Sequence, residues 1–267
     1  MKILTGKQAR PRRVILYGVE GVGKSTWAAG APSPIFLDIE GGIADIDVSK
    51  SQVMKSWGEV VSSIHWLINE RHDFRTVVVD SIDWLEKLIW QQVCHNHNTT
   101  SLEKVGGGFG KGYKFAADVF IELTSLLDGL RRKGISIVLL GHCKAERVEN
   151  PELPAYTQFT PDLHKEAASH LREWADEVLF ATTRIFTRQE DLGFNKSRQV
   201  ALGGNERYIQ TTHSAGVCAK NRLSLPSELP LDWAAYQQYW PTIQPAGNNI
   251  SGVVVDGSSK LKTESVQ

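Results

Sequence analysis

The sequence predicts an α/β fold in which a mainly parallel sheet is flanked by helices and extended by C-terminal antiparallel strands. In the earlier part of the chain, apolar runs typical of buried parallel strands alternate with segments of helical periodicity. From about residue 175 onward, short strand-like segments follow one another, several of them separated by Asn or Gly turns. Sheets of this kind bind ligands at the carboxyl ends of their parallel strands, and we expect the site there.

The length of 267 residues allows one large domain. We expect a folded domain over residues 13–241, with a parallel core at about 13–183 and an antiparallel extension at about 184–225. Residues 1–12 are predicted to form a basic arm, either solvated or in contact with a neighbouring subunit or DNA. Residues 242–267 are rich in Gly, Ser, Asn and Lys, a composition that predicts a disordered tail.

Composition limits the classes of partner. Lys and Arg total 30, as do Asp and Glu, so no net charge attracts nucleic acid or acidic membranes, and such binding would need local patches. No apolar run suits a membrane span or a signal peptide, so we expect no membrane partner and a cytoplasmic location. The three cysteines lie far apart, outside any C-x-x-C spacing, which favours reduced, structural thiols.

The first strand, Val14–Tyr17, leads into a phosphate-binding pattern, Gly18-x-x-x-x-Gly23-Lys24-Ser25. Glycines let backbone N–H groups surround a polyphosphate, and a helix from about Lys24 to Ala29 directs its positive dipole end at the same anion. We expect Lys24 to contact the β and γ phosphates and Ser25 to bind Mg²⁺; the alternative is a glycine-rich turn with a surface lysine. The residues expected at the nucleotide are Gly18, Val19, Glu20, Gly21, Val22, Gly23, Lys24, Ser25 and Thr26.

Three further buried strands lead into polar residues. Ile35–Ile39 is followed by Glu40, and Thr76–Ser81 contains Asp80 in a Walker B pattern, in which the Asp holds Mg²⁺. Ile135–Leu140 leads into His142. Because the carboxyl ends of parallel strands share one edge of a sheet, we expect Glu40, Asp80 and His142 beside the phosphate loop. The alternative for His142 is a hydrogen-bonded core histidine.

The remaining elements follow from periodicity and turn residues. Phe115–Lys133 has the clearest helical stripe and ends at Gly134. Long loops are expected from His95 to Tyr113 and from Cys143 to about Asp162, the second containing three prolines. Further helices are expected at Glu59–Glu70, Ile82–Val93, Leu163–Glu173 and Leu231–Trp240, and short strands at Ala175–Ala181, Arg184–Arg188, Arg198–Leu202, Arg207–Thr211 and Val217–Lys220.

The position of Glu40 indicates which class of phosphate-loop ATPase the sequence resembles. Hydrolysis needs a carboxylate that orients or deprotonates the attacking water. In one large group that glutamate directly follows the Walker B Asp, but here Ser81 follows Asp80. Glu40, at the tip of the neighbouring strand, fits the RecA-type core instead.

The chain also resembles a known family. Phe36–Gly42, Val78–Ser81, Val138–His142 and Lys220-Asn221-Arg222 occur in the order of the motifs of RecA-type recombinases. From Arg13 to Pro226 the chain is similar to phage-encoded RecA-like P-loop ATPases, AAA-domain nucleotide-binding proteins that include single-strand annealing proteins built from the RecA core alone. The resemblance implies a RecA-like P-loop NTPase fold for the main domain, ATP and Mg²⁺ as cofactors and, for a phage protein, the host cytoplasm.

The resemblance implies roles for single residues. Glu40 would be the catalytic glutamate, and His142 stands where the family usually has a Gln that senses the γ-phosphate. Lys220 and Arg222 match a basic pair that reaches across a subunit interface toward a neighbour's γ-phosphate, which implies a homo-oligomer with ATP at the interface. The alternative for this pair is a surface strand of ordinary charge. The predicted catalytic residues are Lys24, Glu40, His142, Lys220 and Arg222, with Ser25 and Asp80 as metal ligands.

The segments Asn96–Lys114 and Cys143–Pro161 occupy the positions of the family's two DNA-binding loops. Their basic and aromatic side chains suit a single-stranded backbone with stacked bases, although they would suit any mobile surface loop too. Acidic residues in the second segment reduce its positive charge and so weaken the case for DNA binding there. The candidate DNA-binding residues are Lys104, Phe109, Lys111, Lys114, Lys144, Arg147, Tyr156 and Phe159.

Together these features predict an ATP-binding, ATP-hydrolysing protein that acts on single-stranded DNA in recombination or annealing. Two alternatives stay open. A small-molecule kinase with the same phosphate loop would need a basic lid and an acceptor pocket, which the C-terminal strands do not resemble. A nucleotide-gated interaction protein would bind ATP and scarcely hydrolyse it.

Overall fold

The computed structural model describes residues 3, 5–6, 9–150, 153–191 and 197–240. The helices are α1 (Lys24–Ala29), α2 (Trp57–Asn69), α3 (Ile82–Asn96), α4 (Lys111–Arg132), α5 (Lys165–Trp174) and α6 (Trp233–Gln237), with a 3₁₀ helix η1 (Leu102–Gly107) before α4. The strands are β1 (Arg13–Gly18), β2 (Pro34–Asp38), β3 (Ser49–Lys50), β4 (Thr76–Asp80), β5 (Ser136–Asn150), β6 (Leu153–Pro161), β7 (Glu177–Asp191), β8 (Ser197–Gln210), β9 (Lys220–Asn221) and β10 (Glu228–Pro230).

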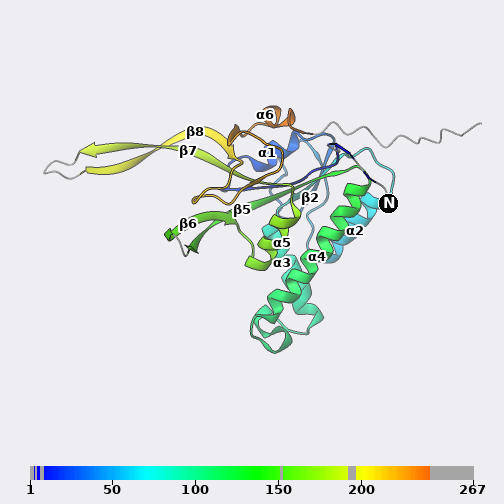
Figure 1. Cartoon of the computed structure of the whole chain (residues 1–267). Helices are drawn as coiled ribbons and strands as arrows, with labels where there is room; N and C mark the ends of the chain where they lie inside the picture. The colour runs from blue at the N-terminus through cyan, green and yellow to red at the C-terminus, as the bar shows by residue number, and fades with distance from the viewer. Residues whose placement is uncertain (1–2, 4, 7–8, 151–152, 192–196, 241–267) are drawn as a thin grey trace, which may run out of the picture.

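The strands of the described chain form one sheet in the order β10-β8-β7-β1-β5-β4-β2-β3, with β6 paired to β5 and β9 to β7. Helices α2 to α5 cover one face of this sheet, and α1 and α6 cover the other (Figure 1). The pairs β7–β1, β1–β5, β5–β4, β4–β2 and β2–β3 are parallel, whereas β7–β8 and β8–β10 are antiparallel. The predicted fold class is therefore confirmed: the protein has a mostly parallel central sheet flanked by helices.

Side chains of the central strands are buried on both faces of the sheet. In β1, Ile15 and Tyr17 pack among α2 to α5, whereas Val14 and Leu16 pack with the residues of α1 and α6. Successive side chains in a strand point to opposite faces, so a strand that is covered on both sides reads as a continuous apolar run. This explains why these strands could be predicted from short apolar runs.

The parallel strands align their polar ends at one edge of the sheet. Gly18 pairs with His142, and Asp80 pairs with Asp38 on one side and Leu140 on the other. The ends of β1, β2 and β4 and the middle of β5 therefore lie at a common level. The candidate functional site is built on this level.

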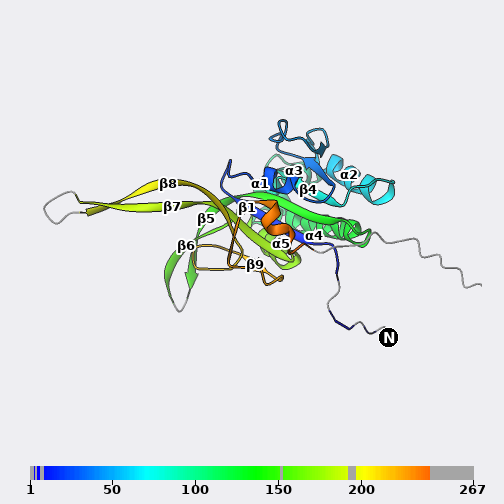
Figure 2. The same ribbon diagram turned by 90° about the horizontal axis from the view of Figure 1, so that it is seen from above.

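Four of the predicted C-terminal strands merge into two long ones. The segments expected at Ala175–Ala181 and Arg184–Arg188 both belong to β7, and those at Arg198–Leu202 and Arg207–Thr211 to β8. At the predicted turn around Gly203 and Gly204 the ladder resumes after a register shift, with Thr183 paired to Arg207 and Ile185 to Gly203. Figures 1 and 2 show β7 and β8 leaving the sheet as a long paired ribbon. The short strands β3 and β10 were not predicted, and only the end of the strand expected at Val217–Lys220 lies in β9.

The long loop expected from Cys143 to Asp162 is a β-hairpin, and that prediction was wrong. Cys143 pairs with Pro161 and Val148 with Tyr156, so β5 continues beyond the parallel sheet and β6 returns beside it. Pro154 and Pro161 had favoured a loop, but both lie near the ends of β6. Proline is tolerated at strand ends and edges because its missing N–H is not needed by the ladder there.

The predicted basic arm meets the domain at its last residues. Pro11 is buried, and its carbonyl oxygen accepts a hydrogen bond from Arg131 Nε (2.8 Å). Arg12 N donates to Ser136 Oγ (3.1 Å). Most of the arm's other basic residues, and the whole predicted tail over residues 242–267, lie outside the residues that the structure describes. No helix of the described residues has the length and apolarity that crossing a membrane requires.

Candidate functional site

The phosphate loop connects β1 to α1, and its glycines are required by the backbone. A Cβ on Gly18 would collide with the carbonyl oxygen of Ala181 on β7. Gly21 and Gly23 have φ values of 67° and 106°, in the left-handed region that glycine adopts without strain. The loop can therefore wrap tightly with its N–H groups free to face an anion.

Lys24 points into this loop. Its side chain is only 7% exposed, and Nζ donates hydrogen bonds to Gly18 O (3.2 Å) and Val19 O (2.9 Å). Burial lowers the pKa of Lys24, while the nearby carboxylates of Asp80, Asp83 and Glu40 oppose that shift. A surface lysine on a glycine-rich turn is therefore excluded, and the ammonium group lies among the polar residues of the strand ends. Of the other loop residues, Val22 is buried, whereas Glu20 and Thr26 are exposed.

Ser25 and Asp80 are in direct contact. Ser25 Oγ donates a hydrogen bond of 2.6 Å to Asp80 Oδ2. Burial raises the pKa of Asp80, and the hydrogen bond from Ser25 opposes the rise. A hydroxyl and a carboxylate are the hard oxygen ligands that Mg²⁺ prefers, usually with phosphate and water oxygens completing the set. No group of three or more His, Cys, Asp or Glu in the described chain is arranged as a metal site. The Ser25–Asp80 pair offers two oxygen ligands of the kind that Mg²⁺ binds.

Glu40 is held next to the Walker B strand. Its backbone N–H, like that of Ile39, donates to Asp80 O, and Asp38 Oδ1 accepts from Gly41 N (2.7 Å) to fix the turn that follows. Ser81 Oγ donates to Glu40 Oε2 (3.0 Å). The Glu40 side chain is 30% exposed. One carboxylate oxygen is therefore anchored, and the group as a whole can still be reached by water.

His142 connects Glu40 to a residue that the sequence reasoning missed. Asp83, in the first turn of α3, accepts from His142 N through Oδ1 (3.1 Å) and contacts His142 Nδ1 through Oδ2 (2.9 Å). An ionised carboxylate only accepts hydrogen bonds, so Nδ1 carries the hydrogen and Nε2 is left facing Glu40 Oε1 at 3.8 Å. The structure thus contains a polar chain, Ser81–Glu40–His142–Asp83, beside the phosphate loop. The side chain of His142 keeps 17% exposure and faces Glu40.

Gly141 explains why Asp83 can reach His142. A Cβ at Gly141 would lie 2.9 Å from Ile82 Cγ1, so only glycine lets the start of α3 approach β5 this closely. The signal in the sequence was an acidic residue one turn after the Walker B Asp. That signal has no meaning until the contact between α3 and β5 is known.

Lys220 and Arg222 lie away from this site. Asn221 pairs with Glu177, and Glu177 pairs with Val14 near the start of β1, whereas the phosphate loop follows the end of β1. At a rise of about 3.3 Å per residue, the length of β1 separates the two levels by roughly 13 Å. Within one chain the basic pair therefore lies at the opposite edge of the sheet from the phosphate loop.

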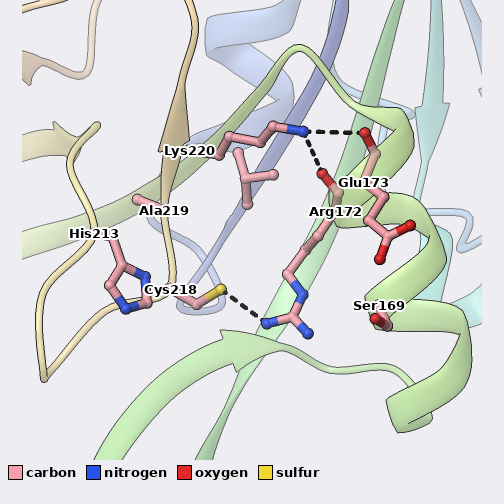
Figure 3. A pocket seen from close by; sticks show the side chains of 8 residues that line it. Ser169, Arg172, Glu173, His213, Cys218, Ala219 and Lys220 are labelled. Atoms are coloured by element: carbon pink, nitrogen blue, oxygen red, sulfur yellow. Dashed lines mark hydrogen bonds between the residues drawn. The ribbon is translucent and has the colours of Figure 1, made fainter.

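Lys220 is bound to the end of α5. Its Nζ donates to the carbonyl oxygens of Arg172 (2.7 Å), Glu173 (3.0 Å) and Ala175 (2.7 Å), which are unsatisfied where the helix ends. Figure 3 shows this contact at the rim of a cavity of about 380 Å³, where Arg172 Nη1 also donates to Cys218 Sγ. Arg222 is the more accessible member of the pair: its side chain is 51% exposed, with one contact of 3.4 Å to Asp176 Oδ1.

The first candidate DNA-binding segment combines η1 with the start of α4. Phe109 is fully exposed at a positive φ of 56°, and Lys104, Lys111 and Lys114 of the same segment are exposed as well. Lys111 Nζ donates to Gly106 O (3.1 Å), which ties the start of α4 to the glycine-rich turn. The segment therefore presents these three cations and the ring of Phe109 to solvent, together with the exposed side chains of Glu103 and Phe115.

The second candidate segment is the β5–β6 hairpin, and its residues are more constrained. Lys144 Nζ donates to Leu163 O (2.6 Å), and Arg147 Nε donates to Glu149 Oε1 (2.9 Å). Phe159 is 41% exposed and stacks on Phe180, with ring centroids 5.3 Å apart. Tyr156 is half-buried. The basic groups here already have partners, so this hairpin offers less free positive charge than the first segment.

The parallel sheet, the phosphate loop and the Ser25–Asp80 pair together define a P-loop nucleotide-binding protein. A family profile described as AAA domain matches residues 10–223, and the chain belongs to this family. Membership supports an ATPase that uses a nucleotide, usually with Mg²⁺.

The chain is also similar to the SPbeta prophage-derived uncharacterized protein YorG of Bacillus subtilis (strain 168). The two are 20% identical over 138 residues, which cover 50% of this chain and 42% of the relative. The chain thus matches less than half the length of that protein.

Proposed function

We propose that the protein is a RecA-like ATPase that hydrolyses ATP as a homo-oligomer and acts on single-stranded DNA in recombination or annealing. The observation that carries this proposal is the position of Glu40. Its carboxylate comes from the strand next to the Walker B strand and is hydrogen-bonded to Ser81, the residue that follows Asp80. The prophage origin of the relative supports a role in a phage.

The chain's own residues divide the work of hydrolysis. The phosphate-loop amides and Lys24 bind the polyphosphate, and Ser25 and Asp80 would hold Mg²⁺, which neutralises phosphate charge when bound. Glu40 keeps one oxygen on Ser81, and its other oxygen can orient a water and hold the proton that it loses. His142, fixed through Nδ1 by Asp83, directs the lone pair of Nε2 at the same space, where it can accept a hydrogen bond from the water beside the terminal phosphate.

Arg222 supports the oligomeric part of the proposal. It lies at the edge of the sheet opposite its own phosphate loop, so it can act on a γ-phosphate only in a neighbouring subunit. Its half-exposed guanidinium suits such a role, whereas Lys220 is engaged with the end of α5. We therefore assign the contact across the interface mainly to Arg222, with Lys220 supporting its strand.

The DNA-binding part of the proposal rests mainly on the segment around Phe109. An exposed ring among Lys104, Lys111 and Lys114 combines a base-stacking surface with phosphate-binding charge. Net charge is zero, so this local cluster must supply the attraction. Lys144, Arg147, Tyr156 and Phe159 on the hairpin would extend the same strand-binding surface.

The decisive experiment measures ATP turnover with and without single-stranded DNA over a range of protein concentrations. We expect DNA to raise the rate and Lys24→Ala to abolish nucleotide binding, because the buried ammonium group is lost from the loop. Turnover that ignores DNA, together with no retention of DNA at low salt, would contradict the recombination role and leave the ATPase. Phosphate transferred to an added metabolite would indicate a kinase.

Glu40→Gln separates hydrolysis from nucleotide gating. An amide cannot take a proton from water, so we expect at least about a hundredfold loss of rate with ATP binding retained. A wild-type rate that is already negligible and does not change in the variant would indicate a nucleotide-gated interaction protein.

A further inference from the structure

Arg207 of β8 lies against the phosphate loop. A Cβ built on Gly23 would stand 3.1 Å from Arg207 Nη1 and 3.9 Å from Leu231 Cδ2. Leu231 N donates to Arg207 O (3.1 Å), so a backbone hydrogen bond holds the two residues together. A guanidinium group and an aliphatic side chain thus flank the last glycine of the loop.

The guanidinium group of Arg207 forms no hydrogen bond or ion pair within the described part of the chain. The residue is exposed. Arg184 on the neighbouring strand β7 contrasts with it, because Arg184 is bound to Glu206 (3.1 Å) and Glu228 (2.8 Å). An unpaired guanidinium beside a phosphate loop is available to an anion, for which its planar fork of donors is well suited.

The order of the strands indicates which part of a nucleotide Arg207 would meet. Strands β5, β4 and β2 lie on one side of β1. His142 is part of β5, Asp80 ends β4, and Glu40 lies just after the end of β2. Strands β7 and β8 lie on the other side. A nucleotide whose terminal phosphate faces Glu40 must extend its nucleoside end the other way, past Gly23 and toward Arg207.

We propose that Arg207 binds the α-phosphate of the nucleotide and that Leu231 packs against its base. This inference rests on the nucleotide binding proposed above. The α-phosphate and the base are common to ADP and ATP, so Arg207 sets the affinity for both nucleotides and leaves the chemical step alone. In this respect it differs from Glu40 and His142, which face the terminal phosphate.

Titration of Mg-ADP and of Mg-ATP into the full chain tests the proposal. We expect Arg207→Ala to raise both Kd values by the same factor, about tenfold or more, because a charge-assisted hydrogen bond to the α-phosphate is lost. At saturating ATP, kcat should be unchanged. Arg207→Glu should weaken both further, and Arg207→Lys should lose less. Arg71→Ala is the matched control, because Arg71 is exposed beyond the end of α2, at the amino edge of the sheet, and should leave both Kd values unchanged.

The outcomes separate the two proposals. If wild type binds ADP and Arg207→Ala binds it equally well, or weakens ATP alone, the role of Arg207 is overturned while nucleotide binding stands. If wild type binds neither nucleotide, both proposals are overturned. Because Arg207 is exposed, we expect its variants to melt like wild type in the absence of nucleotide.

Discussion

The imidazole of His142 is held by one carboxylate and faces another. Asp83 binds both its backbone N–H and its Nδ1, and Nε2 lies 3.8 Å from Glu40 Oε1. This distance is too long for a direct hydrogen bond, and a water beside the two atoms can donate to both. The hydrogen on Nδ1 therefore determines what Nε2 can offer, and Asp83 acts as a positioning residue for His142.

Replacing Asp83 tests this assignment. In Asp83→Asn the amide oxygen can still accept from His142 N, but the amide nitrogen then faces Nδ1 and drives the hydrogen to Nε2. We expect ATP turnover to fall about ten- to a hundredfold, with the Kd for ADP unchanged and the pH profile of turnover altered. A purely structural role would change melting and leave the shape of the pH profile intact.

Asp118→Asn is the control for this change, because Asp118 is an exposed acid on α4. Equal turnover in Asp83→Asn and Asp118→Asn would contradict the role of Asp83.

Residues at the site differ in how far the sequence could predict them. Gly18, Lys24, Ser25 and Asp80 occupy positions whose spacing follows from phosphate and metal chemistry. Asp83 and Arg207 also lie at the site, but they reach it only through the packing of α3 on β5 and the path of β8. No spacing along the chain encodes those contacts.

The elements divide in the same way. Central strands buried on both faces were predicted because each is one apolar run, and α4 because its stripe is long and regular. The β5–β6 hairpin was predicted as a loop, and the β7–β8 ribbon as several short strands. In each, the outer parts are polar, and the two strands pair with one another beyond the core. In such strands prolines, glycines and charges indicate loops, whereas backbone pairing maintains the strand.

Strand β7 begins with a buried acid that should make stability depend on pH. Glu177 is fully buried, accepts a hydrogen bond from Tyr236 Oη (2.6 Å) and lies 3.8 Å from Arg12 Nη1. Burial raises the pKa of Glu177 from 4.5 to about 7. Between these values the folded chain keeps a proton that the unfolded chain releases, so stability falls as the pH rises through this window and levels off above it.

Glu177→Gln cannot ionise and should lose this part of the pH dependence. We expect the variant to gain stability relative to wild type between pH 5 and pH 7.5, by at most about 3 kcal/mol, in urea unfolding at several pH values. Burial also raises the pKa of Glu86 to about 7. The stability of wild type and of the variant should therefore both keep the pH dependence that Glu86 contributes. Exposed Glu122 on α4 provides the control Glu122→Gln, and parallel stability curves for Glu177→Gln and wild type would contradict the prediction.

On the scale of the whole molecule, the groups predicted to act on the terminal phosphate occupy two opposite edges of one sheet. Glu40, Asp80 and His142 lie at the carboxyl edge, and Arg222 lies near the amino end of β1. A single chain cannot bring both sets to one phosphate without breaking β7 from β9. Two chains can, if the edge that carries Arg222 meets the phosphate loop of its neighbour.

This arrangement predicts that two inactive variants restore each other. Glu40→Gln lacks the group that orients water, and Arg222→Ala lacks the cation supplied to the neighbour, whose loss we expect to cost about a thousandfold in turnover. In a mixed oligomer the Arg222→Ala chain contributes an intact Glu40, and the Glu40→Gln chain beside it contributes Arg222. Activity should therefore return on mixing, and wild-type turnover per chain should rise with protein concentration.

The choice of Arg222 over Lys220 makes the mixing experiment interpretable. Lys220 binds three carbonyl oxygens where α5 ends, so its loss would disturb the fold as well as the interface. Arg222 has a half-exposed side chain, and exposed Arg132 on α4 provides a matched control, Arg132→Ala, that should stay active alone. In this proposal each nucleotide is contacted by two chains. If mixing restores no activity, or if wild-type turnover does not depend on protein concentration, hydrolysis is completed within one chain. Lys220 and Arg222 would then be ordinary surface residues.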